Sequence, residues 1–394
     1  NIPLKLIFYI SNNFFTKTLA GIYIHIPYCN KRCIYCDFHF TIAQKNKNHM
    51  LKSIQKEIVK REQYLKNQQV SSIYLGGGTP SVLNPSAIKA LIEKIYNTYQ
   101  IKKSAEITIE CNPEDLTDRK LQAYKNIGIN RLSIGVQSFN DADLKFMNRS
   151  HNTQDAIQSI YLAKKIGFKN ITIDLIYGIP NQELKDWEYN LETMFSLNIQ
   201  HFSAYMLTAE KKTMLHHLIK NKKIQELNDK KIIALFELLQ KKAKKSGFIQ
   251  YEISNYGKKG YFSKHNTSYW NNEHYLGVGP SAHSYNGISR RWNVASNTKY
   301  ISNIKNNLPY FELEKLTADE KYNEYIFTSL RTIWGIDKNV LKTKHGEKKM
   351  SHFLNEIKKW EIKKYVNYNK DHYMLTPSGK AFADLIASDL FIVC

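Results

Sequence analysis

The sequence has 394 residues, more than one hydrophobic core usually serves, so it predicts one large domain with a smaller one appended. Hydrophobic residues make up 42% and charged residues 23%, which excludes disordered, collagen-like and coiled-coil chains. No apolar stretch approaches the roughly 20 residues that a membrane-spanning helix needs, so we expect a soluble protein.

The formal net charge is +22, from 57 basic and 35 acidic residues. Such an excess is typical of proteins that bind nucleic acid or anionic surfaces. Here all but eight of the basic residues are lysines, spread along helical stretches such as 211–245, which indicates a solvated face. We therefore expect no nucleic-acid partner and keep DNA binding as a minor alternative.

Residues 1–20 have no initiator methionine, and a lysine interrupts their short apolar run. A secretory signal has an unbroken apolar centre, so we interpret this segment as a poorly ordered extension. The chain has five cysteines, three of them within eight residues. This is no disulfide framework for a chain of this length, and it indicates a reducing cytoplasm.

Six apolar runs of strand length are separated by stretches with helical spacing. The runs are Gly21–Pro27, Ser72–Leu75, Ala105–Glu110, Arg131–Val136, Ile171–Ile176 and Ile199–Leu207, and the helical stretches are 43–67, 85–98, 117–127, 153–167 and 183–197. Thr117 is a helix-capping residue, and Gly128 and Gly167 are helix stops. Six strand-helix units predict an α/β domain over 21–228 whose parallel sheet curls into a partial barrel, with ligands at the carboxyl ends of the strands.

The pattern changes after residue 228. A long lysine-rich helix and an aromatic segment, Tyr251–Tyr285, form a connecting region that we place at 229–310. The remaining residues, 311–394, contain helices and a short extended pair near Val366 and Tyr373. Helices with a small hairpin predict a winged-helix-like, mostly helical C-terminal domain.

Three thiols, Cys29, Cys33 and Cys36, directly follow the first run. Thiolates are soft ligands that select zinc, Cu(I) or iron-sulfur clusters, so this loop predicts a metal site. Zinc is the main alternative, with His25 or His39 as a fourth ligand, although no second Cys-x-x-Cys or His pair completes a finger. On a cluster of four irons, three protein ligands leave one iron open for a substrate or cofactor.

The spacing Cys29-x3-Cys33-x2-Cys36, with Tyr35 before the last cysteine, resembles the signature of radical S-adenosylmethionine enzymes, which fold as partial (β/α)6 barrels. Further motifs agree, namely Tyr23–Pro27, Gly76–Ser81, Ile107–Pro113, Ser133–Phe139 and Ile173–Pro180. Together they resemble the branch that holds the oxygen-independent coproporphyrinogen III oxidases and the HemW-type heme chaperones. The resemblance runs from about Gly21 to the C-terminus and implies a 4Fe-4S cluster on the three cysteines.

The resemblance also implies contacts to S-adenosylmethionine from Tyr23, Tyr35, Gly77, Gly78, Thr79, Glu110, Gln137, Arg149 and Asp174. Glu110, Gln137 and Asp174 each lie at or just past the end of a different run, where a barrel gathers polar groups at one mouth. The glycines after the second run allow a close backbone approach to a ligand, with an ordinary turn as the alternative. For Arg149, the alternative interpretation is an exposed salt bridge. We interpret Cys111 as a core or pocket thiol.

Two features favour the chaperone group of this branch. The oxidases carry a fourth cysteine two positions after the third, where this chain has Phe38, and they have a longer segment ahead of the cluster, whereas 28 residues precede Cys29. In addition, His265-Asn-Thr-Ser-Tyr269-Trp270 resembles the HNxxYW hallmark of the chaperones. The alternative is the oxidase reaction, a radical oxidative decarboxylation of coproporphyrinogen III.

Heme needs an apolar slot, cations for its propionates and usually an axial His, Cys, Met or Tyr. Tyr269 and Trp270 are candidates for the slot and His265 for the axial ligand. Arg290 and Arg291 are candidates for the propionates. On the residues alone, an aromatic core with a hydrogen-bonded histidine is an equally good interpretation.

The resemblance implies partners as well. A heme chaperone delivers its heme to an acceptor protein, which the sequence does not identify. If the chain is catalytic, it needs an electron donor such as a flavodoxin or ferredoxin. Whether S-adenosylmethionine is cleaved stays open, and a homodimer is compatible with the resemblance.

Overall fold

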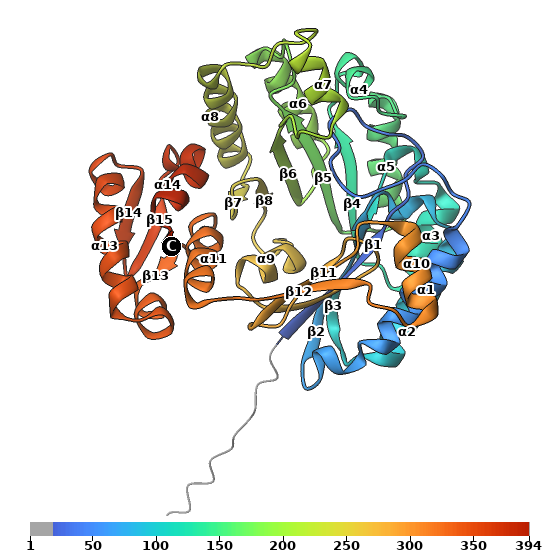
Figure 1. The fold of residues 1–394 in the computed structure, drawn as a ribbon. Helices are drawn as coiled ribbons and strands as arrows, with labels where there is room; N and C mark the ends of the chain where they lie inside the picture. Colours follow the sequence, from blue (N-terminus) through green and yellow to red (C-terminus); the bar gives the residue numbers. More distant parts are fainter. Residues whose placement is uncertain (1–18, 394) are drawn as a thin grey trace, which may run out of the picture.

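The computed structural model describes residues 19–393, so the expectations for residues 1–18 and for Cys394 lie outside the described residues. Figure 1 shows a strongly curved sheet and, beside it, a smaller body formed by the end of the chain. The strands are β1 (Leu19–Ile26), β2 (Gln69–Gly77), β3 (Ile101–Cys111), β4 (Arg131–Gln137), β5 (Asn170–Tyr177), β6 (His201–Met206), β7 (Ile249–Gln250), β8 (Asn255–Gly257), β9 (His274–Val278), β10 (His283–Tyr285), β11 (Ser289–Asn293), β12 (Phe311–Lys315), β13 (Ile336–Asp337), β14 (Val366–Asn369) and β15 (His372–Leu375). The α-helices are α1 (Lys47–Lys60), α2 (Pro85–Thr98), α3 (Asp118–Ile127), α4 (Asp141–Phe146), α5 (Thr153–Lys165), α6 (Leu184–Ser196), α7 (Met214–Lys220), α8 (Asp229–Lys245), α9 (Lys264–Trp270), α10 (Asn297–Asn306), α11 (Ala318–Leu330), α12 (Lys338–Val340), α13 (Glu347–Ile362) and α14 (Ala383–Asp389).

Strands β1 to β6 run parallel and lie next to one another in chain order. This confirms the predicted partial barrel, because each strand returns to the sheet through a helical crossover. Helices α1, α2, α3 and α5 pack in series along the outer face, as Figure 1 shows. The sheet continues past β1 into β9 to β12 and past β6 into β8 and β7, so it does not close on itself within the described residues.

The predicted helix ends of the barrel are confirmed by local geometry. Thr117 caps α3 by accepting a hydrogen bond from the backbone N–H of Lys120. Gly128 ends the same helix in the left-handed conformation, with φ of +98°, which glycine adopts at little cost. The first strand begins at Leu19, two residues before the expected start, so residues 19 and 20 belong to the sheet and not to an extension.

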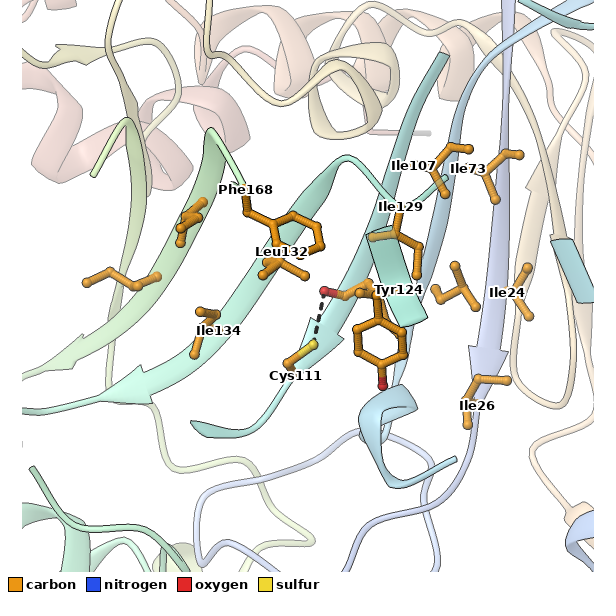
Figure 2. Packing of buried hydrophobic residues seen from close by; sticks show 14 of the residues in the cluster. Ile24, Ile26, Ile73, Ile107, Cys111, Tyr124, Ile129, Leu132, Ile134 and Phe168 are labelled. Atoms are coloured by element: carbon orange, nitrogen blue, oxygen red, sulfur yellow. Dashed lines mark hydrogen bonds between the residues drawn. The ribbon is translucent and has the colours of Figure 1, made fainter. Parts of the chain in front are cut away.

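The main core fills the space between the barrel strands and their helices. Figure 2 shows Ile24, Ile73, Leu132 and Tyr124 among the side chains of this core. Each side chain of this size contributes about 1.5–3 kcal/mol when it is fully buried. Cys111 belongs to this core, and its thiol donates to the Ile109 carbonyl oxygen, 3.7 Å away (Figure 2). This placement agrees with its interpretation as a core thiol.

The segment from β9 to β12 is joined to the barrel by one buried carboxylate. Glu57 in α1 is fully buried and accepts hydrogen bonds from the Gly279 N–H at 2.9 Å and the Tyr300 hydroxyl at 2.5 Å. Arg61 lies 3.7 Å from the same carboxylate. A buried charge is tolerated only when it is paired and hydrogen-bonded, so this network fixes the position of the segment on the barrel.

The C-terminal body has its own hydrophobic cluster, contributed by α11, α13, β14, β15 and α14. Strands β13, β15 and β14 form a small antiparallel sheet, and the two residues between β14 and β15, Lys370 and Asp371, have the positive φ angles of a tight hairpin. This matches the winged-helix-like prediction. The predicted boundary at residue 311 differs from the structure, because β12 pairs with β11 in the main sheet and the helical body begins at α11. Within residues 19–393, no helix is both long and apolar enough to cross a membrane.

Candidate functional site

The cysteine loop leaves the carboxyl end of β1 and is closed at its base by backbone hydrogen bonds. The Cys29 N–H donates to the Thr41 carbonyl at 3.1 Å, and the Thr41 N–H donates to the Pro27 carbonyl at 2.9 Å. All three predicted thiols are free of disulfides and line one cavity of about 530 Å³, which we call the thiol cavity. The loop therefore presents Cys29, Cys33 and Cys36 together at the mouth of the barrel.

The segment after α4 holds the outer part of this loop. The Asn148 side-chain amide donates to the Arg32 carbonyl at 2.7 Å, and the Ile34 N–H donates to the Met147 carbonyl at 3.3 Å. Tyr35 lines the thiol cavity and packs against the small hydrophobic cluster that includes Met147. These contacts fix the loop on both sides of its second thiol.

Two of the three sulfurs receive hydrogen bonds from side chains. Thr79 Oγ1 donates to Cys29 Sγ at 3.3 Å, and Arg149 Nη1 donates to Cys33 Sγ at 3.4 Å. Burial raises the pKa of Cys29 and of Cys36 to about 11 each. These two thiols are therefore neutral at pH 7 until a cation stabilises the thiolate, as a bound metal does.

The donor set fits an iron-sulfur cluster. Three sulfurs come from one loop, with hydrogen-bond donors aimed at two of them, which is the kind of surrounding that tunes such clusters. The zinc alternative lacks its expected fourth ligand, because His25 and His39 do not line the thiol cavity and bond elsewhere.

Two buried carboxyl groups face the same cavity. Glu110 accepts from the Tyr74 hydroxyl at 2.8 Å and the Gly77 N–H at 3.1 Å, while Asp174 accepts from the Ser133 hydroxyl at 3.3 Å. Burial raises the pKa of Glu110 to about 7 and that of Asp174 to about 6. Their proximity also raises the pKa of Glu110, so a cationic ligand between them would favour the ionised form of both.

The two glycines at and directly after the end of β2, Gly77 and Gly78, serve the packing of the protein itself. A Cβ on Gly78 would lie 2.7 Å from the Tyr28 carbonyl oxygen, and a Cβ on Gly77 would lie 2.7 Å from the His25 ring. Gly77 also has φ of +108°, and its N–H holds Glu110 in place. The strand-end backbone thus lies directly against the start of the cysteine loop while Gly77 and Gly78 line the thiol cavity.

Arg149 and Gln137 complete this set. Arg149 Nη2 donates to Asn112 Oδ1 and to the Gly135 carbonyl, both at 2.8 Å, so the side chain lies in the polar wall and not in an exposed salt bridge. Its Nε atom is buried with no hydrogen-bond partner among the described residues. Gln137 has φ of +69°, a strained conformation for a residue with a side chain, and such strain is often kept at ligand sites.

The structure brings together most of the residues that the sequence nominated for S-adenosylmethionine. Those that line the thiol cavity are Tyr35, Gly77, Gly78, Thr79, Glu110, Gln137, Arg149 and Asp174. Tyr23 does not line it, since its ring stacks on Tyr74, which separates it from this cavity. It lines a second cavity instead.

Sequence reasoning missed several polar side chains of the thiol cavity, namely Tyr74, Asn112, Arg131, Ser133, Ser203 and Tyr205. Strand alternation was an available signal for Arg131 and Ser133, which share the parity of Gln137. Arg131 is 2% exposed, and its guanidinium lies 3.3 Å from the His201 ring in the barrel interior. Arginine is rarely buried, so composition alone gave no reason to place it there.

The second cavity, of about 870 Å³, lies between β1, the end of the cysteine loop, α9, β10, β11 and α11. We call it the aromatic cavity, because its walls include the rings of Phe38, Tyr269, Trp270, Tyr275, Tyr285 and Phe327. Asp37 and Phe38 line both cavities, so the two lie next to each other across the end of the cysteine loop. Tyr269 and Trp270 are thus where the sequence predicted a slot.

His265 does not line the aromatic cavity. It is 1% exposed, with Nδ1 2.9 Å from the Ser72 hydroxyl and Nε2 2.8 Å from the Tyr269 hydroxyl. Its ring stacks on Tyr74 at 4.9 Å, and burial lowers its pKa to about 3. The structure therefore places His265 as a neutral, hydrogen-bonded core histidine, which is the alternative interpretation of the motif.

The two arginines predicted to meet propionates are separated by strand alternation in β11. Arg290 lines the aromatic cavity and pairs with Glu324 at 2.6 Å. Arg291 points to the other face, where its guanidinium stacks 3.4 Å from the centre of the Phe311 ring and lies 3.8 Å from Glu57. The expectation for Arg291 is wrong, because a consecutive pair in a strand does not share a face.

Comparisons with known proteins agree with this architecture. The sequence profile of the Radical SAM superfamily matches residues 23–194. Over the whole fold, the structure superimposes on coproporphyrinogen III oxidase (HemN) from Escherichia coli with a TM-score of 0.82, covering 95% of this chain and 90% of that one. The sequence identity there is 21%, so this likeness shows the fold alone.

Two curated relatives match nearly end to end. The heme chaperone HemW of Bacillus subtilis (strain 168) is 34% identical over 376 residues, which are 95% of this chain and 98% of that protein. The heme chaperone HemW of Buchnera aphidicola subsp. Schizaphis graminum is 37% identical over 381 residues, covering 92% and 96%. With the thiol loop, the partial barrel and the HNxxYW helix all in place, the chain belongs to the HemW family of the radical S-adenosylmethionine superfamily.

Proposed function

We propose that this protein is a heme chaperone that binds heme and passes it to an acceptor protein. The observation that carries the proposal is its similarity to a heme chaperone over 95% of the chain. The geometry supports it, because a large aromatic cavity adjoins a separate, polar cavity lined by thiols. Each cavity has the chemistry of a different ligand.

In this proposal Cys29, Cys33 and Cys36 hold a 4Fe-4S cluster in the thiol cavity. When bound, such a cluster supplies electron-transfer capacity and an iron with an open coordination position. The Arg149 guanidinium beside Cys33 offsets the negative charge of the coordinating thiolates. The hydroxyl of Thr79 orients the first sulfur of the loop.

S-adenosylmethionine is the second ligand that we assign to this cavity. It carries an ammonium and a sulfonium group, and the cavity offers the carboxyls of Glu110 and Asp174 to such cations. Their raised pKa values mean that both groups gain from a bound cation. The Asn112 amide and the Arg149 guanidinium provide polar contacts for a carboxylate on the other side.

Heme is assigned to the aromatic cavity. A porphyrin needs flat apolar walls, and the rings of Tyr269, Trp270 and Tyr275 provide them. Arg290 is the arginine among the lining residues and is placed to exchange its carboxylate partner Glu324 for a propionate. The acceptor protein, a cytoplasmic location and a homodimer remain proposals of the same account, and an electron donor such as a flavodoxin or ferredoxin applies if the chain is also catalytic.

The direct test is anaerobic heme titration of the purified chain, followed by mixing of the loaded protein with an apo heme protein. We expect saturable binding of one heme per chain and transfer of the heme to the apo protein, seen as its absorbance spectrum. A chain that binds no heme, or that never releases it, contradicts the proposal. Iron-free zinc mesoporphyrin serves as a control for simple adsorption to exposed rings.

The oxidase reaction is the second candidate, favoured by the HemN-like fold. This chain has Phe38 where the family resemblance implies a fourth cysteine in the oxidases. Anaerobic incubation with coproporphyrinogen III, S-adenosylmethionine and a reductant separates the two: decarboxylated product contradicts a chaperone without enzyme activity. The minor DNA-binding alternative requires salt-dependent binding in a gel-shift titration, and its absence removes that alternative.

A further inference from the structure

We propose that His283, at the start of β10, is the axial ligand of the heme iron. This inference rests on the proposed heme-carrying function and names the ligand within it. The histidine of the HNxxYW motif is unsuited to the role, because both of its ring nitrogens are hydrogen-bonded inside the barrel. A histidine that already lines the aromatic cavity could bind iron without breaking buried hydrogen bonds.

Within the described residues, three histidines line the aromatic cavity, namely His25, His39 and His283. His25 has both nitrogens engaged, since Nε2 donates to the His39 carbonyl at 2.8 Å and Nδ1 lies 3.2 Å from the Tyr23 hydroxyl. His39 has one nitrogen engaged, because Nε2 bonds to Asn297 Oδ1 at 2.8 Å. The ring of His283 makes no hydrogen bond to the described residues, so both of its nitrogens are available.

The surroundings of His283 suit a metal ligand. Its ring stacks on Trp292 across the β10–β11 pair, with 6.2 Å between ring centres, and this contact orients it. Partial burial and the nearby Arg290 lower its pKa, so the ring is neutral and its lone pair is free at pH 7. Phe38 and Tyr285 flank the same space as candidate walls for a macrocycle.

The backbone around His283 is held in place by buried contacts of the neighbouring residues. The next residue, Ser284, is fully buried, and its hydroxyl bonds to Arg61 Nη1 at 2.9 Å and to the Gly277 N–H at 3.0 Å. A Cβ on Gly277 would lie only 2.0 Å from the His283 carbonyl oxygen, so the two strands are in close contact. Two residues before His283, Ser281 has a positive φ of +63°. A ligand on such a backbone is preorganised, which lowers the entropy that binding must overcome.

The charge distribution in the cavity favours one orientation of the heme. Glu320 of α11 lines the wall and repels a carboxylate, whereas the charge of Glu324 is offset by its ion pair with Arg290. Arg290 lies opposite Tyr285, two residues along β10 from His283, and is the cation on this side. With iron at His283, the propionates are therefore expected at Arg290 and towards solvent.

The test compares His283→Ala with His265→Ala and His39→Ala in the full chain, each titrated anaerobically with heme and with metal-free protoporphyrin IX. We expect His283→Ala to shift the Soret band and to weaken heme binding by about tenfold or more, because one iron bond is lost. Its affinity for protoporphyrin IX should stay the same, since that ring has no iron to coordinate. Added imidazole should restore the wild-type spectrum, and His265→Ala should keep it.

The opposite results overturn the inference. Unchanged heme spectrum and affinity in His283→Ala, or an equal loss of protoporphyrin IX binding, would show that His283 is at most part of the wall. Loss of the iron-specific signal in His39→Ala alone would assign the bond to that residue. His283→Gln, which keeps the side-chain size, should behave like His283→Ala if folding is intact. A wild-type chain that binds no heme sinks the proposed function itself and is seen before any variant is made.

Discussion

The thiol cavity and the aromatic cavity adjoin each other but are built in different ways. The thiol cavity is formed by the carboxyl ends of consecutive parallel strands, so short motifs after β1, β2, β3 and β4 meet there by topology alone. The aromatic cavity is formed where α9, β10, β11 and α11 come together from distant parts of the chain. Motifs therefore pointed to most of the predicted residues of the first cavity, whereas much of the second depends on packing between segments that are distant in the chain.

The largest effect is expected at Glu57, whose buried hydrogen bonds support the β9–β12 side of the aromatic cavity. Glu57→Ala leaves Arg61 and Arg291 buried without their carboxylate, so we expect a loss of about 3–5 kcal/mol in the free energy of unfolding. Heme binding should fall with it because Gly279 and Tyr300 lose their shared acceptor. Urea denaturation midpoints and heme titrations measure both.

The matched control for this variant is Glu62→Ala, a substitution at an exposed carboxylate one turn further along the chain. It should change stability by no more than about 0.5 kcal/mol. If Glu57→Ala is equally mild, the buried network does not hold the β9–β12 segment, and the aromatic cavity is supported elsewhere.

Glu110 is the corresponding test of the thiol cavity. Glu110→Gln removes the charge that faces a cationic ligand, so we expect S-adenosylmethionine affinity to fall by roughly 10- to 100-fold, measured by anaerobic calorimetry. Heme affinity in the same variant should be unchanged, because Glu110 lines only the thiol cavity of the two. Equal losses for both ligands would mean that the cavities are not independent.

The same carboxyl predicts a pH dependence. Its pKa is raised to about 7 by burial, and Asp174 is the neighbouring charge that adds to this rise. The ionised form binds the cation, so affinity should be full above pH 7 and should fall as the pH drops below it. The stability of the ligand-free protein should have the opposite pH dependence, because rising pH charges the buried carboxyl and makes folding less favourable. Glu110→Gln should therefore stabilise the ligand-free protein at pH 8. A flat wild-type profile would contradict this assignment.

Gly78→Ala tests how closely the second strand end lies against the cysteine loop. The added Cβ would meet the Tyr28 carbonyl oxygen, so we expect a cost of about 1–3 kcal/mol and lower cluster occupancy after reconstitution. Gly128→Ala is the control, since it also replaces a glycine but has open space around it and only the strain of a positive φ. If the iron content falls equally in both variants, the loss in Gly78→Ala does not come from contact with the cysteine loop.

The smallest effect is expected at Tyr269. Tyr269→Phe removes the hydroxyl that lies 2.8 Å from His265 Nε2 but keeps the aromatic wall, so we expect a loss of about 1 kcal/mol in stability and little change in heme affinity. Thermal melting and heme titration check these outcomes. A large loss of heme affinity would instead indicate that the hydroxyl contacts the ligand directly.

The six barrel strands, the helix caps of α3 and the thiol loop were predictable, because each has a local signal in the sequence. The thiol-cavity residues at strand ends followed from the same logic together with the family resemblance. Tyr23 lines the aromatic cavity and not the thiol cavity, since a motif gives order along the chain but not packing such as its stack on Tyr74.

The aromatic cavity could be predicted only in part. Tyr269 and Trp270 line it as the sequence suggested, but His265, one turn before Tyr269 on the same face of α9, bonds to Ser72 inside the barrel. Arg291 was assigned without regard to strand alternation. His283 was present in the sequence, but nothing local distinguished it until β10 and β11 were paired.

The thiol cavity and the aromatic cavity are expected to hold separate ligands. The decisive measurement is iron, acid-labile sulfide and heme binding on the same anaerobically reconstituted samples of the wild type, Cys33→Ala and Cys111→Ala. We predict about four irons and four sulfides per chain in the wild type and in Cys111→Ala, and loss of both in Cys33→Ala with heme binding retained. Zinc in place of iron and sulfide, or iron and sulfide that persist in Cys33→Ala, would contradict the central claim.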